Sequence, residues 1–191
     1  MPHSAFLNVP YDQRYEKMFV ALIAGLCAFG LRPRATLEIP GPSRRLDRIL
    51  ELISACRYSF HDLSRVQLSH GAPRFNMPFE IGLAVATARW RPAHQWFLFE
   101  ARRFRIQQTL SDLGGTDAYV HGEGPRRLLV ALTDALVRVS KQPTVDELYR
   151  VFRRLSDESI GIRRNYGTLF GARAFRDLVF LATGFVTREM A

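Results

Sequence analysis

Short apolar runs alternate with longer segments of helical periodicity along the first two thirds of the chain. A continuous apolar run of a few residues predicts a buried strand, whereas apolar residues spaced three and four apart predict an amphipathic helix. We expect strands at Ala5–Val9, Leu31–Leu37, Tyr58–His61, Gln95–Phe99 and Ala118–Val120. Pro33 favours an edge position or a late start for the second strand, because proline cannot donate a hydrogen bond to a sheet.

Helices are predicted between and after these strands. The segments with helical spacing are Tyr15–Phe29, Leu46–Ile53, Phe79–Ala88 and Leu128–Leu136. This alternation is typical of a parallel sheet with helices on both faces. We therefore expect an α/β fold with a doubly wound sheet of about five mostly parallel strands. In such a sheet the loops that follow the strands gather along one edge, and ligands bind there.

A different pattern begins near Pro143. Thr144–Leu155 and Thr168–Val186 are predicted to be two amphipathic helices with no strand between them. The expected organisation is therefore an α/β domain over residues 1–141 and a helical C-terminal extension over residues 142–191. The extension would pack on the sheet domain or form a dimer surface.

Length and composition fit this picture, because 191 residues that are 47% hydrophobic suit one compact domain with an appendage. No apolar stretch reaches the roughly 18 residues that a transmembrane helix needs, and no signal-peptide pattern opens the chain. We therefore expect a cytoplasmic protein without a membrane partner. Cys27 and Cys56 lie in helical patterns and are predicted to be buried thiols. The histidines show no ligand spacing, so neither a metal nor a cofactor is expected.

The chain carries a net charge of +9, and arginine supplies almost all of the positive charge. Arginine pairs occur at Arg44–Arg45, Arg102–Arg103, Arg126–Arg127, Arg153–Arg154 and Arg163–Arg164. The planar guanidinium group can bond two phosphate oxygens, which suits a nucleotide or a nucleic acid. The pairs do not form one block, however, and a solvated surface is the simpler interpretation.

Three polar segments are predicted at the strand-end edge. Asn-Val-Pro-Tyr-Asp follows the first strand at residues 8–12, and His-Asp-Leu-Ser-Arg ends the third strand at residues 61–65. Arg-Phe-Asn-Met-Pro-Phe-Glu opens the next helix at residues 74–80. Because these segments meet at one edge, we expect a ligand site there.

The same segments carry a resemblance to a known group of proteins. Asp-Leu-Ser at residues 62–64, followed by Asn-x-x-x-Glu-Ile-Gly-x-Ala at 76–84, resembles the nucleoside 2-deoxyribosyltransferases and the related TIR-like domains that cleave NAD. Phe-Leu-Asn-Val-Pro-Tyr-Asp at residues 6–12 is similar to their first strand and substrate loop. The resemblance covers residues 5–88 and implies a flavodoxin/TIR-like sheet.

The resemblance implies a catalytic role for Glu80, which would attack or stabilise the sugar C1′ as the base leaves. Breaking a C–N glycosidic bond develops oxocarbenium character at that carbon. Pro78 predicts that Glu80 lies in the first helical turn, where the helix dipole favours the ionised carboxylate over a proton donor. Asp62 would hold a ribose hydroxyl or orient the leaving base. The expected substrate-binding residues are Asn8, Pro10, Tyr11 (stacked on the base), Asp12, His61, Ser64, Arg74 and Asn76.

The chain departs from this group at Arg74, which stands near where the deoxyribosyltransferases carry a Gly-Thr or similar pair. An arginine there suits a phosphate, so the expected substrate is a nucleotide or NAD. We expect an N-glycosidic bond-cleaving hydrolase, or a transferase, that forms a homo-oligomer through its C-terminal helices. One alternative is a non-catalytic nucleotide-sensing or signalling module with the same pocket. The other, ranked lowest, is a basic nucleic-acid-binding protein whose binding weakens with salt.

Overall fold

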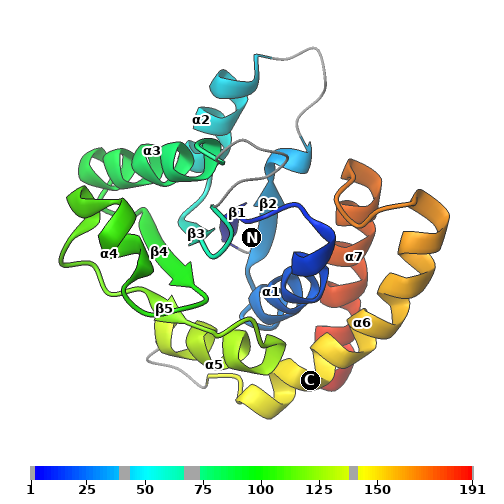
Figure 1. Ribbon diagram of the computed structural model, residues 1–191. Coiled ribbons are helices and arrows are strands. Elements are labelled where there is room, and N and C mark those ends of the chain that lie inside the picture. Colours follow the sequence, from blue (N-terminus) through cyan, green and yellow to red (C-terminus); the bar gives the residue numbers. More distant parts are fainter. Residues whose placement is uncertain (1–2, 39–43, 67–73, 138–141, 191) are drawn as a thin grey trace. The chain divides into compact units, whose positions relative to one another are not determined.

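The computed structural model describes residues 3–38, 44–66, 74–137 and 142–190, and it shows an α/β fold (Figure 1). The strands are β1 (Ser4–Asn8), β2 (Arg32–Ala35), β3 (Tyr58–Asp62), β4 (Gln95–Glu100) and β5 (Tyr119–Val120). The helices are α1 (Glu16–Ala28), α2 (Arg45–Ala55), α3 (Asn76–Trp90), α4 (Arg105–Thr109), α5 (Pro125–Ala135), α6 (Val145–Tyr166) and α7 (Ala172–Glu189). Each of the five strands overlaps a predicted segment, and β1, β3 and β4 each extend one residue beyond the predicted bounds.

The five strands form one sheet in the order β2-β1-β3-β4-β5. The pairs β1–β3, β3–β4 and β4–β5 are parallel, with Phe60 opposite Leu7 on one side and Phe97 on the other. This is the strand order of doubly wound, flavodoxin-like sheets, and it confirms the predicted fold class. β2 lies at the edge of the sheet, as Pro33 predicts.

The chain divides into two compact units. The first comprises residues 1–2, 11–33 and 123–191, and the second comprises residues 3–10 and 34–122. The predicted domain boundary after residue 141 stays a prediction, and residues on both sides of it lie in the first unit.

In the second unit, α2 and α3 pack on the sheet through two apolar clusters. One cluster contains Phe6 of β1 together with Ile49, Ile53, Cys56 and Ala84. The other contains Leu63, Met77, Ile81, Leu98 and Ile106. Cys56 is a buried free thiol, as predicted. The two clusters hold α3 over the ends of β1 and β3, which positions the candidate site.

In the first unit, α1 packs against α5, α6 and α7 and is buried along most of its length. A capping box between Thr144 and Glu147 begins α6. α6 then continues to Tyr166, eleven residues beyond the predicted end at Leu155. The small residue Ser159 interrupts the apolar stripe without ending the helix, since Ile162 beyond it is buried again. Cys27 of α1 is a buried free thiol, as predicted.

Gly25 allows α1 and α5 to approach closely. A Cβ atom at this position would lie 2.6 Å from Cδ2 of Leu132 and 2.9 Å from Cδ2 of Leu129. We expect Gly25→Val to lower the free energy of unfolding by about 1–3 kcal/mol, because extra carbon atoms overpack a dense core. Urea denaturation measures the change. Gly161→Val on α6 is the matched control, since a Cβ there meets no atom within 4 Å. Equal losses in the two variants would contradict close packing at Gly25.

Two helices begin at other residues than predicted. α3 begins at Asn76, three residues before the predicted Phe79, and α7 begins at Ala172 rather than at Thr168.

Within the described ranges, no helix is long and apolar enough to span a membrane.

Candidate functional site

Buried polar side chains stand at the carboxyl ends of four neighbouring strands in the second unit. Asn8 ends β1, Asp62 ends β3, Glu100 ends β4, and His121 directly follows β5. Burying a polar group costs free energy unless it is hydrogen-bonded. Each of these side chains therefore needs a hydrogen-bond partner at a position where an apolar side chain would need none. The predicted strand-end edge therefore carries a buried polar side chain at each of these four strands.

Asn8 connects β1, β3 and the first turn of α3. Its Nδ2 atom donates a hydrogen bond to the carbonyl oxygen of Met77 at 2.8 Å and lies 3.0 Å from Nδ1 of His61. An amide nitrogen can only donate, so Nδ1 of His61 is the acceptor and the ring proton is on Nε2. The start of α3 is thereby fixed to the sheet edge.

His61 is held in its neutral form. The ring has no exposed surface, and its burial, together with the neighbouring His94, lowers the pKa to about 3. Nε2 of His61 has no hydrogen-bond partner within the described part of the chain. A neutral imidazole with its proton on Nε2 is a hydrogen-bond donor and not a general base.

Glu80 is a buried carboxyl on α3, with only 4% of its surface exposed. Burial raises its pKa to about 7, against the opposing effects of Arg45 on α2 and of a hydrogen bond with the Asn76 side chain. The prediction that Glu80 lies in the first turn is wrong. α3 begins at Asn76, so Glu80 lies in the second turn, beyond the strongest part of the helix dipole. Desolvation of the carboxylate therefore dominates.

Asp62, Ser64 and His121 form a second buried cluster. Oδ1 of Asp62 accepts hydrogen bonds from the backbone N–H of Ser64 at 2.9 Å and from its hydroxyl. Nε2 of His121 lies 2.9 Å from Oδ2 of Asp62 and 3.0 Å from Oγ of Ser64. Both contacts reach the same ring nitrogen, whereas a catalytic triad uses the two nitrogens of its histidine separately. The cluster therefore shapes the loop after β3 and is not a nucleophile relay.

Four residues around these clusters were not predicted from the sequence to belong to the site: Arg45, Glu100, Arg105 and His121. Glu100 accepts a hydrogen bond from the backbone N–H of Ile106 at 3.1 Å, and Arg105 donates to the carbonyl oxygen of Ser64 at 2.8 Å. Glu100 and His121 could have been found as polar residues at strand ends. Arg45 and Arg105 follow no such pattern, because folding alone brings them to Glu80 and Ser64.

Tyr11 and Asp12 belong to the first unit. The Tyr11 ring centroid lies 5.6 Å from that of Phe170 and 6.2 Å from that of Phe19. Asp12 accepts hydrogen bonds from the N–H groups of Arg14 and Tyr15 and so caps a short 3₁₀ helix, Gln13–Tyr15. The stacking of Tyr11 on a base and the contact of Asp12 with a substrate stay predictions.

Pro10 and Arg74 lie in the second unit. Pro10 is buried, and Arg74 is half-buried just before α3. The backbone N–H of Arg74 donates to the carbonyl oxygen of Val66 at 3.3 Å. The expected contact between Arg74 and a phosphate stays a prediction.

The structure thus gathers Asn8, His61, Asp62, Ser64 and Glu80 at one edge of the sheet, with Asn76 bonded to Glu80. Glu80 is the acidic group there whose pKa is brought near neutrality, which is a common property of catalytic carboxyl groups. Comparison of the chain with models of protein families, with curated proteins and with solved structures gives no match.

Proposed function

We propose that this protein hydrolyses the N-glycosidic bond of a nucleotide or of NAD, with Glu80 as the carboxylate that acts at C1′. The observation that carries the proposal is the placement of Glu80. It is a buried carboxyl on α3, and Asn8 fixes the first turn of that helix to the end of β1. Ligands of open α/β sheets bind at this edge.

The chemistry requires one bond to break and one to form. The base leaves with the electron pair of the C1′–N bond, and positive charge develops at C1′. The ionised Glu80 would stabilise that charge while water adds to the carbon and loses a proton, or it would first bond to C1′ and then leave with the electron pair of that C1′–O bond as water adds. A pKa near 7 leaves the carboxylate accessible at neutral pH, and the positive charge of the sugar would favour it further.

Other residues of the edge would orient the substrate. The amide of Asn76, an exposed residue, is a donor suited to sugar hydroxyl groups. Asp62 would act by fixing the loop after β3, since its two carboxylate oxygens already contact Ser64 and His121. We propose Asp62 as a positioning residue rather than a second nucleophile.

The test is the release of free base from a panel of nucleosides, nucleotides and NAD, followed by chromatography. We expect Glu80→Gln to lower the rate by about 100-fold or more, because an amide can neither carry the negative charge nor attack C1′. The control is Glu51→Gln, the same change at an exposed position on α2. It should keep the wild-type rate, and melting temperatures verify that both variants fold.

Two outcomes would overturn the proposal. One is base release that Glu80→Gln leaves unchanged. The other is no release from any substrate while one nucleotide raises the melting temperature, which would favour a non-catalytic sensing module.

A further inference from the structure

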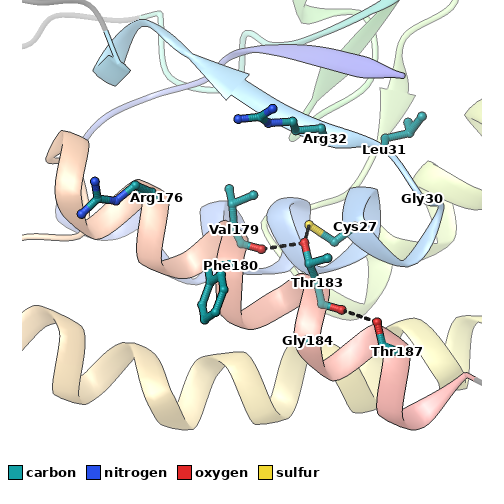
Figure 2. A pocket seen from close by; sticks show the side chains of 10 residues that line it. All are labelled: Cys27, Gly30, Leu31, Arg32, Arg176, Val179, Phe180, Thr183, Gly184 and Thr187. Atoms are coloured by element: carbon teal, nitrogen blue, oxygen red, sulfur yellow. Dashed lines mark hydrogen bonds between the residues drawn. The ribbon is translucent and has the colours of Figure 1, made fainter. Parts of the chain in front are cut away.

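A pocket of about 530 Å³ lies within the first unit, between the end of α1, the start of β2 and α7 (Figure 2). Pockets of roughly 300–1,000 Å³ are typical of small-molecule sites. None of the residues of the candidate site lines it. The pocket is therefore a separate feature of the fold, and its occupant can be inferred from its own walls.

The pocket wall is mostly apolar. Cys27 and Leu31 lie on one side, and Val179 and Phe180 of α7 lie on the other. Phe180 is 77% exposed, so it adds apolar surface beside the pocket.

The threonines of the wall offer little polarity of their own. The Thr183 hydroxyl donates to the carbonyl oxygen of Val179 at 2.8 Å, and the Thr187 hydroxyl donates to that of Thr183 at 3.1 Å (Figure 2). The Thr183 hydroxyl also lies 3.9 Å from Sγ of Cys27, so both hydroxyl groups are engaged within the first unit. The wall is suited to hydrocarbon rather than to a hydrogen-bonding ligand.

Two arginines supply the charge of the pocket. Arg32 begins β2, and its side chain forms no hydrogen bond or ion pair within the described part of the chain. Arg176 of α7 has Asp177 as a distant partner, with Nε and Oδ1 3.9 Å apart. Among the described residues, no acidic side chain lines the pocket. An apolar wall with unbalanced positive charge is complementary to an apolar molecule that carries one anionic group.

The pocket is also long and open along α7. From Arg176 to Thr187 the helix rises by about 16 Å. A Cβ atom at Gly184 would meet no atom within 4 Å, so the glycine leaves space within the pocket.

We propose that this pocket binds a long-chain fatty carboxylate. Its carboxylate would bond Arg32 and Arg176, and its hydrocarbon chain would lie against Leu31, Phe180 and the space at Gly184. The proposal is independent of the chemistry at Glu80.

The test uses cis-parinaric acid, a fatty carboxylate whose fluorescence rises in an apolar environment, and its displacement by oleate. Gly184→Leu should weaken binding at least tenfold by filling the pocket. Gly161→Leu is the matched control, because a Cβ there also meets nothing and α6 does not line the pocket. It should bind like the wild type.

The charged end is tested separately. The double variant Arg32→Gln/Arg176→Gln should weaken oleate binding at least tenfold, whereas Arg173→Gln, on α7 outside the pocket, should not. Oleyl alcohol, which has the same chain without the charge, should bind the wild type at least tenfold more weakly than oleate. The proposal is overturned if the probe does not bind, if Gly184→Leu leaves binding unchanged, or if alcohol and carboxylate bind equally well.

Discussion

Lowering the pH from 7 to 4.5 is expected to remove about 3 kcal/mol of stability through His61 alone. Burial, together with His94, lowers its pKa from 6.5 to about 3 in the folded protein. Between those values the unfolded chain binds a proton that the folded protein does not. The contribution of His61 is therefore complete above pH 6.5 and is lost as the pH falls toward 3. Each pH unit in that window is worth about 1.4 kcal/mol.

The measurement is urea denaturation at several pH values between 4.5 and 7. His61→Gln cannot titrate, so its stability should fall less steeply toward acid than that of the wild type, by about 3 kcal/mol over the range. His3→Gln, the same change at an exposed position, should keep the wild-type dependence. Parallel pH profiles for the wild type and His61→Gln would show that His61 is not held neutral by burial.

Raising the pH from 4.5 to above 7 is expected to lower the free energy of unfolding by about 3 kcal/mol, because Glu80 ionises. Burial raises the pKa of this carboxyl from 4.5 to about 7 in the folded state. Between those values the folded protein keeps a proton that the unfolded chain has released. The contribution is thus fully present below pH 4.5 and is lost as the pH rises through 7.

Glu80→Gln should reveal this cost, because glutamine stays neutral at every pH. Relative to the wild type, the variant should gain about 3 kcal/mol of stability between pH 4.5 and 8.5, as measured by urea denaturation. Arg45→Met should have the opposite effect on the pH dependence of stability. Arg45 favours the ionised carboxylate, so its loss should raise the pKa of Glu80 and make the stability fall further as the pH rises. A difference between the wild type and Glu80→Gln that does not change with pH would contradict a buried, titrating Glu80.

Much of the fold could be predicted from the sequence because it is a matter of local pattern. The apolar run around Phe6 and the proline at Pro33 were enough to place β1 in the sheet and β2 at its edge. The start of α3 could not be placed as well. Asn76 and Met77 enter the helix because Asn8, far away in the chain, bonds the carbonyl oxygen of Met77.

The candidate site was predictable in position but not in electrostatics. Asp62 and Glu80 could be assigned to one edge from the alternation of strands and helices alone. The pairing of Asp62 with His121 joins residues that are 59 positions apart, and no local pattern marks it. The pKa of Glu80 likewise depends on how deeply α3 buries it, which outweighs the helix dipole that the sequence suggested.

The most direct test of the central claim is the titration of the Glu80 carboxyl by ¹³C NMR, with Glu80→Gln identifying its signal. We expect a midpoint at about pH 7, because burial opposes ionisation. In Arg45→Met, where the opposing arginine is gone, the midpoint should be higher. A midpoint near the ordinary value of 4.5 in both proteins would contradict the account, because Glu80 would then be an ordinary solvated carboxylate without the properties of a reactive group.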